Sequence, residues 1–297
     1  MHADPPTDSR RPLDAAALRS ALVEAPGAPY STLDVVDEIG STNAELLGRA
    51  ADGAADRSVL LAELQTSGRG RLGRSWTAPV GTQVAVSVLL RPGAVSPTLY
   101  GWLPLVTGLA VRDALSSAGG VDATLKWPND VLVGGRKVAG ILVEMTMVRG
   151  GGDFAVPLPA LVVGVGINVG LRSDELPVPH ATSLVLEGGS GDRDAVARAV
   201  LEAMAHRHGQ WRACDRGSGA TVSDELVRAY SAACSTLGAD VRVELPAGGS
   251  RTGRAVRVDR EGRLVVRPDD AGGAADEVAV AAGDVTHVRA AGGGWGG

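Results

Sequence analysis

A loop rich in arginine and glycine is the first segment whose residue types predict a binding chemistry. It reads GRGRLGR over residues 68–74 and holds three arginines, Arg69, Arg71 and Arg74, within six positions. A guanidinium group pairs with a carboxylate or a phosphate through two parallel hydrogen bonds, and glycine lets the backbone fold closely over a ligand. The loop therefore predicts a site for an anionic ligand, with a solvated basic loop as the alternative.

The same loop matches the G-x-G-x-x-G pattern of dinucleotide-binding proteins, but its surroundings exclude that function. A dinucleotide fingerprint must open a helix, because the helix N-terminus holds the pyrophosphate. Here an irregular segment follows the loop, and after it comes a second strand-like run, QVAVSVLLR at 83–91. The sequence also contains neither the GxxxxGK[ST] loop of P-loop proteins nor the GxSxG elbow of α/β-hydrolases.

Lysine is confined to one short stretch of the chain. Lys126 and Lys137 are the only lysines among the 29 basic residues, and they lie in the segments KWPND (126–130) and GGRKVAG (134–140). An ammonium group is a compact point charge that fits between two anions, as phosphoryl chemistry requires. The placement fits a role in phosphoryl chemistry, and the alternatives at this point are chance and an ordinary turn with an exposed lysine.

Two glycines interrupt an apolar run further along the chain. Gly164 and Gly166 lie in GVGINV, just before Asn168. Glycine weakens a strand unless a ligand or another backbone approaches it closely. This strand is therefore expected to lie against a ligand, with a β-bulge as the alternative.

Composition excludes several classes of protein. The chain has 297 residues, of which 44% are hydrophobic and 21% charged, so a folded protein with a sizeable core is expected. Cys214 and Cys234 form no CxxC pair, which disfavours a disulfide scaffold or structural zinc and suits the reducing cytoplasm. Neither a signal peptide nor an 18-residue apolar span is present. The net charge of -5 disfavours general nucleic-acid binding.

Apolar periodicity places these motifs among strands and helices. Strands are expected at 33–40, 58–65, 83–91 and 159–171, with a hairpin through Gly134-Gly135. Helices are expected at 41–52, 97–117, 193–213 and 223–233, and a shorter helical stretch is expected near Leu13–Val23. Thr42 is the expected N-cap of the first helix, with Glu45 completing a capping box, and His206 and His208 are expected on a helix surface.

Short β runs with glycine-rich turns begin near residue 238 and are typical of a small barrel. The expected organisation is therefore an N-terminal extension that is partly disordered, a ligand-binding catalytic domain, a small β domain and a disordered tail. The boundaries are 1–30, 31–236, 237–290 and 291–297.

Taken in order, the motifs resemble those of the biotin–protein ligases. The resemblance is carried by Ser41-Thr42-Asn43, Gln65, GRGRLGR-S-W at 68–76, KWPND at 126–130, GGRKVAGILVE at 134–144 and GVGINV at 164–169. It implies an α+β fold, with a mixed β-sheet and flanking helices like the catalytic domain of class II aminoacyl-tRNA synthetases. It also implies an SH3-like β-barrel at the C-terminal end.

The resemblance implies an enzyme that uses two substrates, biotin and Mg²⁺-ATP, to make biotinyl-5′-AMP. The enzyme then transfers biotin to a lysine of the biotin carboxyl carrier domain of an acyl-CoA carboxylase. Carried over by position, the biotin-binding residues are Ser41, Thr42, Asn43, Gln65, Arg69, Gly70, Arg71, Lys126 and Gly140. The ATP- and adenylate-binding residues are Arg71, Arg74, Lys126, Asn168, Gly164 and Gly166.

The implied catalytic residues are Lys126 and Arg71. Lys126 would bridge the biotin carboxylate and the α-phosphate, and Lys137 is left with a less defined contact to substrate or acceptor. Mg²⁺ is expected to arrive with ATP rather than in a metal site of the protein.

Two other functions remain open at this stage. A lipoate–protein ligase shares the implied chemistry but lacks KWPND and the GRGRxGR loop, and a non-catalytic biotin-binding regulator would need a DNA-binding element. Residues 1–30 are too short for a winged-helix domain, so a ligase without repressor activity is expected, with no DNA or membrane partner. The sequence leaves open whether the chain is a monomer or a weak homodimer.

Overall fold

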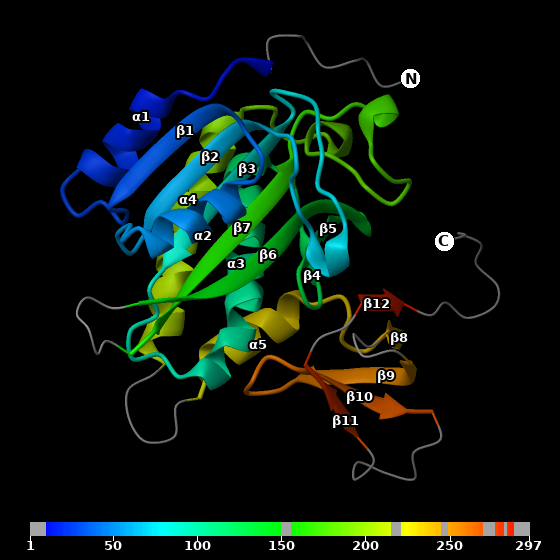
Figure 1. Ribbon diagram of the computed structural model, residues 1–297. Helices are drawn as coiled ribbons and strands as arrows, with labels where there is room; N and C mark the ends of the chain where they lie inside the picture. The colour runs from blue at the N-terminus through cyan, green and yellow to red at the C-terminus, as the bar shows by residue number, and fades with distance from the viewer. Residues whose placement is uncertain are drawn as a thin grey trace.

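A seven-stranded mixed sheet forms the centre of the molecule (Figure 1). The computed structural model describes residues 10–149, 156–214, 221–244, 249–269, 277–281 and 284–287. The strand order is β1-β2-β3-β7-β6-β5-β4, with β1 and β2 parallel and every other pair of neighbours antiparallel. The strands are β1 (Thr32–Ile39), β2 (Ser58–Gln65), β3 (Gln83–Leu90), β4 (Thr124–Lys126), β5 (Asp130–Val133), β6 (Arg136–Val148) and β7 (Leu158–Asn168).

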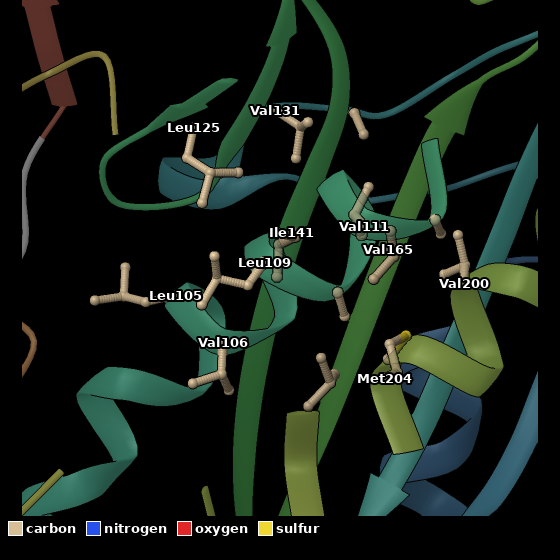
Figure 2. Close-up of a cluster of buried hydrophobic side chains, with 14 of the residues drawn as sticks. Leu105, Val106, Leu109, Val111, Leu125, Val131, Ile141, Val165, Val200 and Met204 are labelled. Atoms are coloured by element: carbon tan, nitrogen blue, oxygen red, sulfur yellow. The ribbon is translucent and has the colours of Figure 1, made fainter. Parts of the chain in front are cut away.

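Helices cover both faces of this sheet, so the expected mixed-sheet α+β fold is confirmed. Helices α3 (Leu103–Ala114) and α4 (Arg193–Ala213) pack on one face, where they meet the side chains of Ile141 and Val165 from the sheet (Figure 2). Helix α2 (Thr42–Ala51) packs on the other face over a smaller apolar cluster. All eight residues of β3 are buried, because this central strand is covered on both sides.

Helix α2 begins at Thr42, its predicted cap residue, and so one residue earlier than expected. Ser41, rather than Thr42, is the N-cap residue, and its hydroxyl accepts a hydrogen bond from the backbone of Ala44 at 3.4 Å. Ser41 has an extended backbone, as a cap requires. Thr42 is thereby released from capping, and its side chain joins the site described below.

The short helical stretch expected near Leu13–Val23, within the N-terminal extension, is present. This segment contains α1 (Ala15–Arg19), continued by a π-helical turn (Ser20–Glu24), and it packs against the main core. Leu13, Leu18 and Leu22 are buried there. Three leucines at four- and five-residue spacing supply the apolar stripe that binds a short helix to a sheet. Residues 1–9 lie outside the described part of the chain.

The C-terminal β runs form a second, five-stranded antiparallel sheet of order β11-β10-β9-β8-β12. Its strands are β8 (Asp240–Glu244), β9 (Ser250–Val258), β10 (Leu264–Pro268), β11 (Val278–Val280) and β12 (Asp284–His287). This arrangement is consistent with the expected SH3-like domain. Helix α5 (Asp224–Ala233) precedes it, so the expected division at residue 237 falls between α5 and β8. The expected tail, 291–297, lies outside the described residues.

Two tryptophans attach the small sheet to the unit built on the large sheet. Trp102 donates from Nε1 to the Asp259 carbonyl at 3.2 Å, and Trp127 donates from Nε1 to the Gly262 carbonyl at 3.0 Å. Both rings are buried, which leaves these N–H groups no water as an alternative partner. The KWPND segment is therefore packed directly against the C-terminal sheet.

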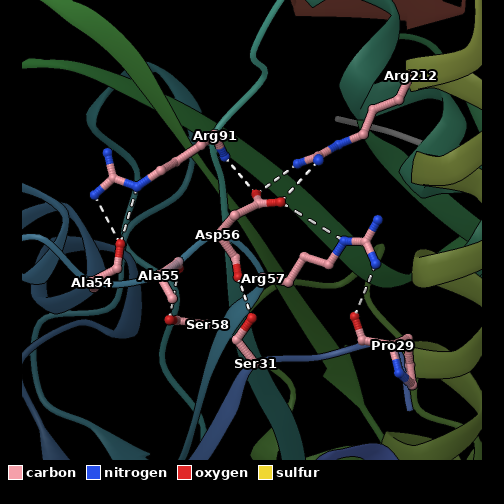
Figure 3. Close-up of polar contacts among 9 residues, drawn as sticks. All are labelled: Pro29, Ser31, Ala54, Ala55, Asp56, Arg57, Ser58, Arg91 and Arg212. Atoms are coloured by element: carbon pink, nitrogen blue, oxygen red, sulfur yellow. Dashed lines mark hydrogen bonds and ion pairs between the residues drawn. The ribbon is translucent and has the colours of Figure 1, made fainter. Parts of the chain in front are cut away.

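Asp56, just before β2, holds two strands of the large sheet and helix α4 together. Its carboxylate accepts from the Arg91 backbone N–H at 2.7 Å and from both Nη atoms of Arg212, at 2.9 and 2.6 Å (Figure 3). These charge-assisted bonds join the start of β2, the end of β3 and the last turn of α4.

His208 is buried, so the prediction that both helix histidines lie on the surface is wrong for it, whereas His206 is exposed. His208 Nε2 lies 3.0 Å from Thr107 Oγ1, and that hydroxyl donates to the Leu103 carbonyl. The hydroxyl proton is therefore committed, and Nε2 is the donor to Thr107. Burial, with the nearby Arg212 and Arg57 as smaller causes, lowers the pKa of His208 to about 3.

We expect this histidine to make the fold acid-sensitive. Because its pKa is near 6.5 in the unfolded chain and about 3 in the folded one, the unfolded state binds the extra proton between these values. As the pH is lowered through this window, the free energy of unfolding should decrease, by at most about 1.4 kcal/mol per pH unit from this residue. Urea unfolding of the wild type and of His208→Gln, which keeps a donor for Thr107, measures the difference. Equal slopes for the two proteins would contradict the assignment.

Candidate functional site

A cavity of about 360 Å³ opens on the face of the large sheet that carries α2. This volume suits a ligand of metabolite or drug size. The N-terminal end of α2, the loop after β2, the ends of β5, β6 and β7, and the segment 177–181 enclose it. The polar and glycine residues that line it are Ser41, Thr42, Asn43, Gln65, Arg69, Gly70, Arg71, Arg74, Ser75, Thr77, Asn129, Asp130, Lys137, Gly140, Gly164, Gly166, Asn168 and His180.

Glycines of strands β6 and β7 form the floor of the cavity, so bare backbone faces it there. Gly140 of β6 and Gly166 of β7 are register partners, and the ring of Trp76 lies directly on them. A Cβ atom at Gly166 would lie 2.4 Å from the Trp76 ring, and one at Gly164 would lie 2.3 Å from the Asn43 side chain. The close approach predicted for these strand glycines is therefore present, and both contacts come from other parts of the protein.

Buried amides and hydroxyls form the end of the cavity next to α2. Gln65 Oε1 accepts from the Thr42 backbone N–H at 2.9 Å and lies 3.1 Å from the Thr42 hydroxyl. Ser87, on β3, lies within 2.7 Å of the Thr42 hydroxyl and 2.6 Å of Asn43 Oδ1. Asn43 in turn donates to Glu144 at 2.9 Å. This rigid polar network suits the recognition of an uncharged polar group such as a urea or an amide.

The arginine loop closes over the cavity as a small hairpin. The Gly70 N–H donates to the Arg74 carbonyl at 2.7 Å, and the Trp76 N–H donates to the Gly68 carbonyl at 2.8 Å. Arg69 forms an ion pair with Glu144 at 3.6 Å, while Arg71 donates to Asn129 Oδ1 at 3.2 Å. Three guanidinium groups are therefore carried at the mouth of the cavity.

Lys137 supplies the fourth cation of the cavity. Its Nζ atom lies 2.6 Å from Asp130 Oδ1 and 5.6 Å from the centroid of the Trp76 ring. The Lys137 and Asp130 side chains are 22% and 19% exposed, so the pair is largely withdrawn from water. Trp76 is itself held by a 2.8 Å bond from Nε1 to Gln83 Oε1. The ammonium is therefore fixed by a carboxylate and an aromatic face rather than left mobile on its stem.

The structure does not bring Lys126 to this cavity, contrary to the expectation that it is the central catalytic group. Lys126 ends the edge strand β4, and β5 separates it from the β6 floor. The lysine that lines the cavity is Lys137. The β5–β6 hairpin explains the difference, because it pairs Lys137 with Leu132 and so brings its side chain back toward Asp130.

Every other residue in the sequence-based assignment lines the one cavity. Sequence reasoning gave no ligand role to Trp76, Asn129, Asp130 or the segment 177–181, all of which also line it. A signal for the Lys137–Asp130 pair was present in the two-residue Gly134-Gly135 turn. Such a turn fixes hairpin register, and register brings these two charges together.

The charges at the cavity suit an anionic ligand. Four cations line it, and Asp130, the acid among its lining residues, is paired with Lys137, while Glu144 beside it is paired with Arg69. Within the described residues, no three His, Cys, Asp or Glu side chains lie together as metal ligands, and no helix is long and apolar enough to span a membrane. The site is therefore suited to stabilise negative charge that is shared between a carboxylate and a phosphate.

Comparison with known proteins gives consistent similarities. The model of the biotin/lipoate A/B protein ligase family matches residues 38–168. The chain is 42% identical to the biotin--[acetyl-CoA-carboxylase] ligase of Mycobacterium tuberculosis, over 94% of this chain and 97% of that protein. It is 39% identical to the ligase of the same name from Paracoccus denitrificans, over 58% of this chain and 70% of that protein.

Comparison with solved structures gives the same kind of similarity. The biotin protein ligase from Aquifex aeolicus in complex with biotin and ATP superposes with a TM-score of 0.67 and 27% identity, covering 88% of this chain and all of that one. The segment matched by the family model contains every cavity-lining residue named above from Ser41 to Asn168.

The contact between Trp76 and the floor leads to a prediction on stability. Gly166→Ala should lower the free energy of unfolding by about 1–3 kcal/mol, because the new Cβ would push the Trp76 ring off the strand and strain its bond to Gln83. Gly48→Ala, in the middle of α2 with open space around it, should instead stabilise by about 0.5–1 kcal/mol. Urea denaturation checks both, and destabilisation of the two variants alike would refute the contact.

Proposed function

Because the chain belongs to the biotin/lipoate A/B protein ligase family, and within it to the biotin ligases, we propose that this cavity activates biotin with ATP. The product is biotinyl-5′-AMP, from which biotin passes to a lysine of the biotin carboxyl carrier domain of an acyl-CoA carboxylase. The observation that carries the proposal is the single cavity in which a buried amide–hydroxyl network and four cations meet over a glycine floor.

The network at the end of α2 is the proposed site for the ureido ring of biotin. A ureido group carries two N–H donors and one carbonyl acceptor, and Thr42, Asn43 and Gln65 offer both kinds of partner in a fixed arrangement. The valerate chain then extends through the cavity beside the Trp76 ring, which lines it together with the glycines of β6 and β7. Its carboxylate reaches the cation group at the opposite end.

Charge neutralisation is the main catalytic task at that end. The biotin carboxylate attacks the α-phosphate of ATP, a bond forms between its oxygen and phosphorus, and pyrophosphate leaves. Two anions must approach each other, so Lys137 between them and Arg69 and Arg71 above them stabilise the developing charge. Asp130 keeps the Lys137 ammonium at the floor, ready to meet both substrates without a further conformational search.

The second half-reaction, the transfer of biotin to the carrier lysine, takes place in the same cavity. The amine of the carrier lysine attacks the acyl carbon, an amide bond forms, AMP leaves with the electrons of the C–O bond, and the amine loses a proton. The hairpin at 68–76 covers the mixed anhydride until the carrier arrives and so limits its hydrolysis.

ATP reactions of this kind use Mg²⁺, and the described residues do not form a site of their own for it. Asp130, the carboxylate on the floor, is paired with Lys137. We therefore assign Mg²⁺ to the phosphates and water molecules of bound ATP, in line with its preference for such ligands, and no step above depends on a metal ligand from the chain.

The test is a pair of assays on the full-length protein. Biotin-dependent exchange of labelled pyrophosphate into ATP reports the first half-reaction, and biotin transfer to a purified carrier domain reports the second. Lipoate serves as the matched substrate control, since the family also contains lipoate ligases. Exchange that depends on lipoate rather than biotin would replace this proposal with a lipoate ligase.

The two lysines give the sharpest variant pair. Lys137→Ala should lower kcat/KM for biotinyl-AMP formation by about 10²–10³-fold, because the neutralising charge is lost and Asp130 is left unpaired. Lys126→Ala removes the same residue type from the neighbouring edge strand and should stay within about threefold of the wild type. Initial rates of pyrophosphate exchange measure both, and a large loss in Lys126→Ala alone would restore Lys126 as the catalytic lysine.

A further inference from the structure

The segment Arg10–Asp14, called here the N-terminal strap, crosses the molecule next to the cavity although none of its residues lines it. Its Leu13 N–H donates to Glu63 Oε1 at 2.7 Å, and its Arg11 carbonyl accepts from Arg193 Nη1 at 3.1 Å. Glu63 and Arg193 pair at 2.7 Å, with side chains only 6% and 2% exposed. The strap is therefore anchored on a buried ion pair.

That ion pair leads to the aromatic side of the cavity. Arg193 Nε donates to the Gln83 carbonyl at 2.8 Å, and the Gln83 side chain holds the indole of Trp76. Because the buried Arg193 side chain donates to both the Arg11 and the Gln83 carbonyls, its position fixes the strap and Gln83 relative to each other.

The outer end of the strap contacts two loops. The Arg10 guanidinium pairs with Glu175 Oε2 at 2.6 Å, with side chains 27% and 12% exposed. Glu175 also accepts from the Arg172 backbone N–H at 3.0 Å. The segment that follows supplies Pro177, Val178, His180 and Ala181 to the cavity wall.

The second loop is the one that follows Trp76. The Arg10 carbonyl lies over Gly81, where a Cβ atom would be 2.7 Å from that oxygen. Gly81 has a φ of +73°, and its backbone turns under the strap before β3 begins. Arg10 thus touches both loops that form the mouth of the cavity on this side.

We propose that Arg10 and Glu175 are positioning residues that keep the cavity mouth closed around the bound acyl-adenylate. Resting on the proposed function, the inference adds a control on how long the adenylate stays bound. Loops already fixed by the strap lose less conformational freedom when a ligand binds, and they open less often afterwards. The consequence is slow release of the reactive intermediate, at an unchanged rate of the chemical step.

The experiment measures release of labelled biotinyl-5′-AMP from the full-length protein after a chase with unlabelled ligand. Arg10→Gln should release the adenylate about three- to tenfold faster, the loss expected for one charge-assisted contact. Its kcat for pyrophosphate exchange should stay within about twofold, because Arg10 touches no reacting atom. Arg10→Lys, which keeps the charge, should recover most of the slow release.

Two matched controls separate positioning from general stability. Arg11→Gln changes the adjacent strap arginine, whose side chain is 62% exposed and pairs with Asp194 instead of a cavity loop. It should release the adenylate at the wild-type rate. Gly81→Ala should speed release, whereas Gly53→Ala, at a positive φ but in open space, should only lower the melting temperature.

The outcomes are distinguishable. Faster release in Arg10→Gln and Gly81→Ala, but not in their controls, supports the proposal. A wild-type release rate in Arg10→Gln, even with a lowered melting temperature, overturns it and leaves the strap a purely structural element. Absence of biotinyl-AMP synthesis by the wild type would instead refute the proposed function itself.

Discussion

The contact between the Trp76 indole and the bare backbone of β6 and β7 is the constraint on which the site depends. It requires glycine at 166, where a Cβ atom would lie 2.4 Å from the ring, and it leaves little space at 140, where a Cβ atom would lie 3.1 Å from the ring. With the ring held there, Lys137 has an aromatic face to lie against and the arginine hairpin has a fixed end. The cation group is therefore set by packing against the sheet, and its electrostatics follow from that packing.

The strands and the anion-binding loop could be predicted from the sequence, because their signals are local. The uninterrupted apolar run of β3 and the two-glycine turn before β6 each reflect a single element. The lysine that lines the cavity could not be chosen in this way. Lys126 and Lys137 have the same chemistry and both lie in motifs, and only the order of β4, β5 and β6 separates them.

For the N-terminal segment, the sequence indicates the short helix near Leu13–Val23 but not the surface on which residues 10–14 lie. Composition does not reveal that Glu63 and Arg193 are buried beneath them. A buried ion pair is costly unless its remaining hydrogen-bonding positions are filled. The strap fills two of these positions with the Leu13 N–H and the Arg11 carbonyl. The ion pair therefore fixes the strap, and the strap in turn satisfies the ion pair.

The scarcity of lysine acquires a physical meaning in this setting. An arginine at 137 would have to place a broad, planar group where Asp130, Trp76 and Gly140 leave room for a compact ammonium. The Nζ atom of Lys137 is held 2.6 Å from the Asp130 carboxylate. The other lysine lies outside the cavity. Lys137 is therefore the one lysine among the residues that line the cavity, and its position there depends on Asp130 and Trp76.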